Sequence, residues 1–104
     1  MNKANVVLLP AARRRYFEIW RYTAEKWGDD QADLYLQDLL KFLQGLSGNK
    51  KSYSKAGKKY DGLYKTKFKR HYIFFRVLSD GRIAVLTILH ENMDIPTRLF
   101  EDTK

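Results

Sequence analysis

The sequence predicts an α+β fold with the element order β-α-α-β-β-β. Two observations carry this prediction. After a short apolar run, the first half of the chain places apolar residues at helical spacing. The second half changes to an alternation with a period of about two, which is typical of strands that bury one face. We therefore expect an antiparallel sheet with an N-terminal helical hairpin packed on one of its faces.

The first strand and the first helix are expected to adjoin. Residues 5–9 form a short apolar run, and Pro10 suits the first turn of a helix, where its missing N–H is not needed. Gly28 can adopt a positive φ and is expected to end this helix. The apolar stripe between these two points consists of Ala12, Tyr16, Ile19, Thr23 and Trp27.

A second helix follows almost at once. Asp29 or Asp30 can cap its N-terminus, and both favour the positive end of its dipole. Its wide apolar face can bury against both a partner helix and a sheet, and Gly45 marks its fraying end. Because so few residues join the helices, they are expected to pack as an antiparallel hairpin. The stripe consists of Ala32, Leu36, Leu39, Leu43 and Leu46, broadened by Tyr35, Leu40 and Phe42.

Three strands are expected after a loop at residues 47–61. In residues 63–68 the alternation puts Tyr64, Thr66 and Phe68 on one side, and Lys65, Lys67 and Lys69 on the other. Residues 72–77 are aromatic and β-branched, as is typical of a central strand. Residues 93–100 are expected to form a short tail or a helical turn.

The last strand is expected at residues 82–89, after a two-residue hairpin turn at Asp80-Gly81. Strict alternation would place Ile83, Val85, Thr87 and Leu89 on one face, and Ala84, Leu86 and Ile88 on the other.

Composition limits the class of protein. The chain has 104 residues, of which 44% are apolar, which is enough for one domain and too few for two. The absence of cysteine excludes a disulfide scaffold, a zinc–thiolate site and a cysteine nucleophile. No apolar stretch could span a membrane, and residues 1–5 are followed by too little apolar sequence for a secretory signal. We therefore expect a cytoplasmic protein with no membrane partner.

The positive charge is concentrated in the middle of the chain. The net charge is +8, from 20 Lys and Arg against 12 Asp and Glu. Residues 50–76 hold ten basic side chains and one acidic one, Asp61, and aromatic residues are interleaved with the basic ones. This pattern fits backbone neutralisation and base stacking on a nucleic acid. A solvated lysine-rich loop followed by an ordinary strand is the alternative. A row of lysines on one strand face repels itself, which favours an anionic partner.

The sequence shows no pattern typical of a cofactor or metal site. It has no phosphate-binding glycine loop, no cluster of metal ligands and no nucleophile elbow, so we expect neither cofactor nor metal. His71 could act as a general acid or base, or could be a turn histidine bonded to backbone. His90 could face the same groove or simply pack at a strand end. Trp20 and Trp27 are expected in the core or closing the hairpin, although Trp20, beside the stripe, could also help form a partner groove.

Three segments resemble ParE toxins of the RelE/ParE superfamily. Ile19, Tyr22 and Trp27-Gly28 resemble the family's I-x-x-Y-x-x-x-x-W-G opening, and Gln31-Ala32 and Tyr35-Leu36 follow in the same way. Residues 70–77 resemble its H-x-I-F-Y-R strand. Residues 88–94 match its I-L-H-x-x-M-D ending, which Thr97-Arg98-Leu99 extends. The resemblance implies a single RelE/ParE-like toxin domain over residues 1–104.

The resemblance also implies partners. ParE-like toxins trap DNA gyrase on cleaved DNA and block replication, and an acidic ParD-like antitoxin neutralises them by direct binding in a hetero-oligomer. We therefore expect a gyrase poison that acts without chemistry of its own, with DNA in the gyrase complex as a further candidate partner. RelE-like members cut mRNA on the ribosome, and that is the alternative. A degenerate member that binds only its antitoxin is a third possibility.

Candidate site residues follow from these expectations. Where the family has G-x-R, this chain has Gly62-Leu63-Tyr64, so Lys65 or Lys67 would replace the arginine. The antitoxin is expected in a groove between the hairpin and the sheet, against Arg13, Tyr16 and Trp20. A ribonuclease would use His71, His90 and Arg76, although the C-terminal Arg and Tyr pair of such enzymes is missing. The residues expected to contact the target are Lys65, Lys67, Lys69, Arg70, His71, Arg76, His90, Met93 and Arg98.

Overall fold

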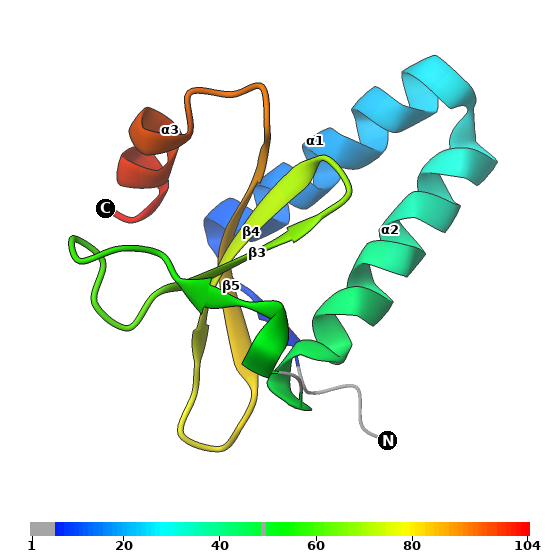
Figure 1. The fold of residues 1–104 in the computed structure, drawn as a ribbon. Helices are drawn as coiled ribbons and strands as arrows, with labels where there is room; N and C mark the ends of the chain where they lie inside the picture. Colours follow the sequence, from blue (N-terminus) through cyan, green and yellow to red (C-terminus); the bar gives the residue numbers. More distant parts are fainter. Residues whose placement is uncertain (1–5, 49) are drawn as a thin grey trace.

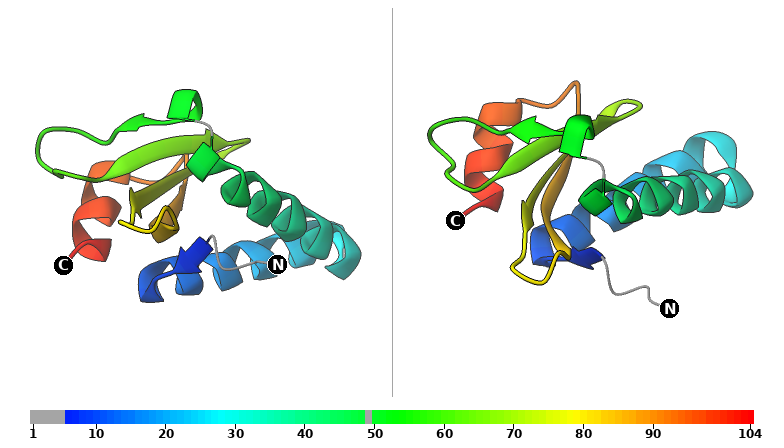
Figure 2. Two further views of the ribbon diagram at one scale, coloured as in Figure 1. Left: turned by 90° about the horizontal axis from the view of Figure 1, so that it is seen from below. Right: turned by 60° about the horizontal axis from the view of Figure 1, so that its bottom comes forward.

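The computed structural model describes residues 6–48 and 50–104, so Asn5 of the expected first strand and the N-terminal segment before it lie outside the described residues. The helical hairpin runs along one side of the sheet, and the C-terminal helix lies on the other (Figures 1 and 2). No helix within the described ranges is long and apolar enough to cross a membrane. The elements in chain order are β1 (Val6–Leu8), α1 (Pro10–Trp27), α2 (Asp29–Gln44), two 3₁₀ turns (Leu46–Gly48 and Lys50–Ser52), β2 (Ser54–Lys55), β3 (Tyr64–Phe68), β4 (His71–Val77), β5 (Ile83–His90) and α3 (Ile95–Asp102).

Gly28 alone joins α1 to α2. Its φ of 94° lets the chain reverse between the helices, which confirms the expected helix end. The same residue is the N-cap of α2, so the prediction that Asp29 or Asp30 caps this helix is wrong. Both carboxylates already lie in its first turn, because the connection is too short to leave either outside the helix. They still lie at the positive end of the helix dipole.

The predicted apolar stripes are largely confirmed. Four of the five predicted stripe residues of the second helix are buried in α2, and the fifth, Leu46, is buried in the 3₁₀ turn that follows it. Ala12, Ile19 and Thr23 of α1 are buried too, and Tyr16 is half-buried. Trp27 is the exception, because its side chain is 65% exposed. The tip of the hairpin extends past the sheet, so the last turn of α1 has no strand to pack against (Figure 1).

The sheet has five strands in the order β1-β5-β4-β3-β2. Pairing is antiparallel except between β1 and β5, which run parallel with Val6 opposite Ile83. The sheet is therefore mixed, and not the purely antiparallel one that the sequence predicted, because β1 adds a parallel strand at this edge. At the other edge the two-residue strand β2, which the sequence did not predict, pairs with the start of β3.

A bulge in β5 changes which side chains face the helices. Phe74 of β4 pairs with Thr87, and the next residue, Phe75, pairs with Val85, so Leu86 has no partner. The predicted strict alternation therefore fails beyond Val85. Ile83, Val85 and Ile88 pack on the α1–α2 side of the sheet, whereas Leu86 and Leu89 pack on the α3 side.

The two hairpin turns of the sheet also depart from expectation. The β4–β5 turn has three residues between Leu78 and Arg82 rather than two, and Gly81 has the positive φ that this turn requires. The β3–β4 turn consists of Lys69 and Arg70, and Lys69 has a φ of 53°, which is unusual for a residue other than glycine.

Both faces of the sheet are covered, not one. The larger core lies under α1 and α2, and the smaller one, built on Leu63, Phe74, Leu89 and Leu99, lies under α3 and residues 56–63. Of the short tail or helical turn expected at residues 93–100, the structure has the helical form, a helix of about two turns at Ile95–Asp102. Asp94 caps it: Thr97 donates both its backbone N–H, at 3.5 Å, and its hydroxyl, at 2.8 Å, to the carboxylate.

The end of α3 is held by Asp102, whose side chain is only 4% exposed. Its carboxylate accepts a hydrogen bond from the Thr87 hydroxyl of β5 at 2.7 Å. It also pairs with Arg15 at 3.2 Å and Arg14 at 3.3 Å, both on α1. One carboxylate therefore connects α3 with both α1 and the sheet.

Candidate functional site

A groove opens between the helical hairpin and the ends of β4 and β5. Two adjoining cavities of about 380 and 500 Å³ form it, and both are lined by Tyr22, His71, His90 and Asn92. Trp27, Tyr35 and Lys69 line the part towards α2, and Met93 lines the part towards α3. We call this surface the histidine groove.

The floor of the histidine groove is a pair of histidines. His71 begins β4 and lies opposite His90, which ends β5. The rings meet edge to face, with centroids 5.1 Å apart. A hydrogen bond of 2.8 Å joins the Tyr35 hydroxyl, from α2, to Nδ1 of His71. The backbone N–H of Asn92 donates to Nδ1 of His90 at 3.0 Å, so a neutral His90 carries its proton on Nε2.

Burial keeps His71 neutral. The pKa of His71 is lowered from 6.5 to about 4, first by burial and then by the neighbouring His90, while the charge of Glu91 opposes the shift. Burial also raises the pKa of Tyr35, whose phenol stays protonated. At neutral pH His71 is therefore uncharged and a weak proton acceptor, because an effective general base has a pKa near the working pH.

The rim of the groove is cationic. The ammonium of Lys69 lies 5.3 Å from the centre of the Tyr35 ring and 5.4 Å from that of Phe68, both on the hairpin side of the sheet. The prediction that Lys69 shares a face with Lys65 and Lys67 is therefore wrong. Because β3 ends at Phe68, the alternation of its side chains stops before Lys69.

Glu91, next to this rim, forms ion pairs with two cationic side chains. Its carboxylate lies 2.9 Å from the Lys67 ammonium and 2.8 Å from the Arg70 guanidinium. The hydrogen bond between Lys67 and Glu91 raises the pKa of the lysine and lowers that of the glutamate. Lys65 lies exposed on the same α3-facing side of β3, and no ion pair of the described residues includes it.

Two predicted site residues lie away from the groove. Arg76 is five residues along β4 from His71, a distance of about 17 Å at the rise of a strand, and donates to the backbone carbonyl of Asp61 at 2.9 Å. Arg98 lies on α3, 3.4 Å from Glu101. The structure thus brings Lys69, Arg70, His71, His90 and Met93 together. It does not bring Arg76 to the two histidines, which a ribonuclease built on these three residues would need.

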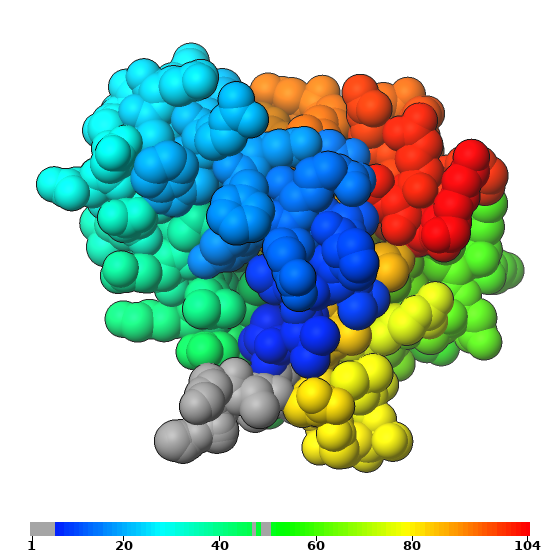
Figure 3. Space-filling model, turned by 180° about the vertical axis from the view of Figure 1, so that it is seen from behind, coloured from blue at the N-terminus to red at the C-terminus, as the bar shows by residue number. Residues whose placement is uncertain are grey.

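The residues expected to meet an antitoxin lie on a different surface. Tyr16 and Trp20, with Phe17 and Arg21, line a hollow of about 440 Å³ on α1, not the groove between helices and sheet. Trp20 donates its indole N–H to Asp33 of α2 at 2.8 Å, and Phe17 is 63% exposed. Arg13 is exposed one turn earlier. In Figure 3, α1 runs across this face of the molecule in blue.

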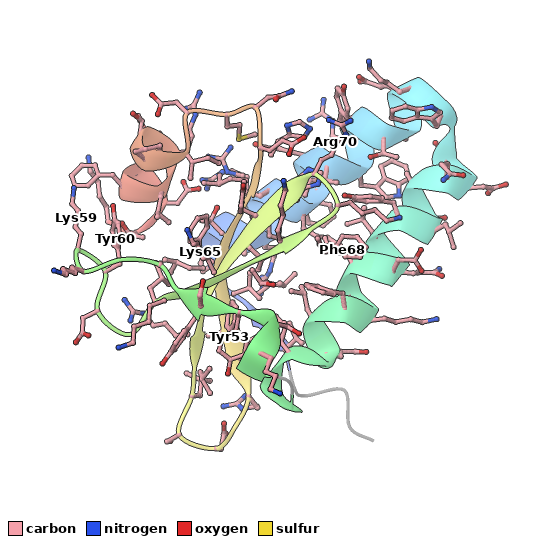
Figure 4. The ribbon with its side chains drawn as sticks, in the orientation of Figure 1. Tyr53, Lys59, Tyr60, Lys65, Phe68 and Arg70 are labelled. Carbon is pink, nitrogen blue, oxygen red and sulfur yellow. The ribbon has the colours of Figure 1, made fainter. Side chains whose placement is uncertain are left out.

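Sequence reasoning missed four residues of this region. Tyr35 was assigned only to the apolar face of α2, and nothing local indicates that its hydroxyl reaches His71, 36 positions away. Glu91 and Asn92 follow β5 without a recognisable signal. Tyr22 carries one, since it belongs to the segment that resembles the family's helical opening. In Figure 4, Arg70 lies at the end of the β3–β4 hairpin beside α1, and Phe68 points towards α2.

Two solved structures of bacterial toxin–antitoxin systems contain chains with this architecture. The fold is similar to a chain of the chromosomal ParDE toxin–antitoxin system of P. aeruginosa, with a TM-score of 0.67 over 83% of this chain and 94% of that one, at 16% identity. It is also similar to a chain of the toxin–antitoxin complex RelBE2 of Mycobacterium tuberculosis, with a TM-score of 0.62 over 84% and 96%, at 13% identity. The fold is thus that of the RelE/ParE toxins.

Sequence comparison gives the family within this class. Residues 6–95 match the family described as ParE toxin of type II toxin-antitoxin system, parDE. The chain is 33% identical to toxin ParE1 of M. tuberculosis over 89% of its own length and 95% of that protein's. It is 29% identical to toxin ParE of Escherichia coli, with 83% and 84% covered. The chain belongs to the ParE toxin family.

Proposed function

We propose that this protein arrests growth by poisoning DNA gyrase in the cytoplasm, and that an acidic antitoxin neutralises it by direct binding. Membership of the ParE family carries the proposal, because the resemblance to ParE-like toxins implies a protein that traps gyrase on cleaved DNA. The charge of the chain supports it too. A net charge of +8 favours association with the acidic antitoxin and with DNA held by gyrase.

The neutral His71 at the floor of the histidine groove supports a toxin that acts by binding. Cleavage of mRNA needs a proton acceptor and cations around one phosphate. His71 has a pKa of about 4, and the three residues expected for a ribonuclease do not converge. RelE-like cleavage is therefore the less supported alternative.

The surface proposed to contact gyrase combines the histidine groove with the adjoining face of β3. Lys65 and Lys67 supply exposed positive charge there. Lys67 and Arg70 both form ion pairs with Glu91. The groove next to them is lined by aromatic rings, so the surface offers both charge and apolar contact area, as protein interfaces commonly do. Arg98 and Arg76 lie outside this surface.

Two surfaces suit the antitoxin. The α1 hollow combines the exposed ring of Phe17 and the half-buried rings of Tyr16 and Trp20 with Arg21, and exposed Arg13 lies one turn away. This combination fits an acidic peptide with apolar anchors. The histidine groove is the second, and an antitoxin that covered it would also block the surface proposed for gyrase. Association in a hetero-oligomer with the antitoxin follows from either arrangement.

The deciding experiment mixes the purified protein with gyrase, ATP and supercoiled plasmid, followed by detergent and gel electrophoresis. We expect linear DNA that depends on gyrase and disappears when the cognate antitoxin is added first. Unbroken plasmid with normal supercoiling contradicts the proposal. Ribosomal mRNA cleavage is then tested with His71→Gln and His90→Gln together, which should abolish cleavage by a ribonuclease that uses these bases.

A further inference from the structure

A second basic surface lies on the α3 side of the sheet, away from the histidine groove. It consists of the loop before β3, the outer face of β3 and β4, and the end of α3. In Figure 4, Lys59 and Tyr60 project from this loop beside α3, and Lys65 lies on the strand next to them. The cations of this surface, which we call the basic loop face, are Lys58, Lys59, Lys65, Arg76 and Lys104.

The charges of the basic loop face are not neutralised. All five side chains are exposed. None of them has a carboxylate partner among the ion pairs of residues 6–48 and 50–104, whereas Lys67, Arg70 and Arg82 each have one. Of the neighbouring carboxylates, Glu101 is paired with Arg98 and Asp102 is held by Arg14 and Arg15. Asp61, exposed in the same loop, adds one negative charge against the five positive ones. The surface therefore keeps its positive potential.

The loop that carries these cations is held in one shape by its own hydrogen bonds. The backbone N–H of Ala56 donates to Leu63 at 2.8 Å, and the N–H of Leu63 donates to Tyr60 at 3.1 Å. Arg76 donates to the carbonyl of Asp61 at 2.9 Å, and Ala56, Tyr60 and Leu63 pack into the core under α3. Lysines on such a loop lose less backbone entropy on binding than lysines on a mobile one.

Lysine ammonium groups lie near the aromatic rings of this surface, of which Phe100 is 48% exposed. The ammonium of Lys59 lies 5.2 Å from the centre of the Phe100 ring and 5.8 Å from that of Tyr60. Lys104 lies 5.3 Å from the centre of the same Phe100 ring. Two like charges thus share one ring, and the face is poorly suited to stack bases or to hold apolar anchors of a peptide.

We infer that the basic loop face binds the phosphate backbone of duplex DNA. A surface that offers positive charge, and whose rings already have lysines beside them, suits a duplex. The bases of a duplex are inside and its phosphates are outside. A single strand would need open rings for stacking, and an acidic protein would need apolar anchors. The inference goes beyond the proposed gyrase poisoning and stands without it, because it concerns DNA binding by this chain alone.

Binding of a DNA duplex of about 20 base pairs, measured by fluorescence anisotropy over a series of salt concentrations, tests the inference. Contacts to four or five phosphates predict a slope of about −4 for log K against log salt concentration. The double variant Lys59→Gln with Lys104→Gln should reduce the size of that slope by about 1.8 and weaken binding roughly tenfold or more near physiological salt. Circular dichroism confirms that the variant is folded.

The matched control is Lys26→Gln with Lys41→Gln, which removes the same charge from α1 and α2. This control should keep the parental slope. If both double variants lose the same affinity for DNA, the net charge of the protein alone attracts the duplex, and the inference is overturned. Binding to a polyglutamate peptide with the same dependence on Lys59 and Lys104 overturns it too, in favour of an acidic protein. Because gyrase is absent from this titration, its result is independent of the plasmid cleavage experiment.

Discussion

His71 is the residue at which three parts of the fold meet. It begins β4, lies against His90 of β5 and forms a hydrogen bond with Tyr35 of α2. Its imidazole therefore joins the hairpin to the sheet at the floor of the groove. This role requires the neutral ring, since a positive charge there would be partly buried beside another histidine.

The stability of the fold should therefore depend on pH through His71. The unfolded residue titrates near 6.5 and the folded one near 4, so on acidification the unfolded state takes up the proton first. The contribution of neutral His71 to the free energy of unfolding is full above pH 6.5 and is lost as the pH falls towards 4. Allowing for partial solvent screening, we expect a loss of about 2 to 3 kcal/mol.

Urea unfolding of the parent and of His71→Gln at several pH values measures this effect. The free energy of unfolding of the parent should fall more steeply than that of the variant between pH 6.5 and 4. Parallel curves over this range would show that the folded and unfolded pKa values of His71 are alike.

At the level of elements, the C-terminal helix depends on a single carboxylate. Asp102 is almost fully buried and binds Arg14, Arg15 and Thr87. Removing one partner of a buried pair leaves the other desolvated without compensation. Substitution of Asp102 should therefore weaken the packing of α3 on the sheet, and with it the core around Leu99.

Asp102→Asn is expected to destabilise the protein by about 3 kcal/mol, because the nearly buried Arg15 loses its buried anionic partner and keeps only the exposed Glu18, at 3.3 Å. Glu101→Gln is the matched control on the same helix. It loses only the exposed pair with Arg98 and should cost less than about 0.5 kcal/mol. Thermal unfolding of both variants decides the matter, and equal midpoints would show that Asp102 does not anchor α3.

The elements also show where sequence reasoning succeeds. The stripe of α2 was predicted residue by residue, because helical periodicity is a local pattern. The bulge at Leu86 was not, since Leu86 and Thr87 both suit a strand and only pairing with β4 makes one of them supernumerary. Strand β2 has just two residues, and its pairing with Tyr64 and Lys65 gives no periodic signal. At the site, the histidines were found, but the hydroxyl of Tyr35 reaches them only through the tertiary fold.

At the scale of the whole molecule, folding divides the basic segment between two surfaces. Residues 50–76 are one block of charge in the sequence. In the structure, Lys69 and Arg70 lie at the groove, whereas Lys58, Lys59 and Arg76 lie under or beside α3. Lys65 and Lys67 lie on the same face of β3, where Lys65 belongs to the basic loop face and Lys67 lies between it and the histidine groove.

Lys65→Gln with Lys67→Gln is therefore expected to abolish growth arrest while the fold stays intact, because both side chains are exposed. Induction of the variant in cells without antitoxin, with colony counts, measures this. The pair Lys41→Gln and Arg82→Gln, with the same net charge and outside the proposed contact surface, should arrest growth like the parent. Full arrest by the first variant contradicts the role of the β3 face in binding the target.

The parallel pairing of β1 with β5 has a consequence for the newly made chain. Val6 finds its partner Ile83 only 77 positions later. At translation rates of about 5 to 20 residues per second, the first strand waits roughly 4 to 15 s for its neighbour. The hairpin of α1 and α2, whose contacts are local, can form in that interval with its leucines uncovered. A nascent chain thus cannot assemble the histidine groove until β5 has been synthesised, so translation that stops before β5 yields no toxin surface.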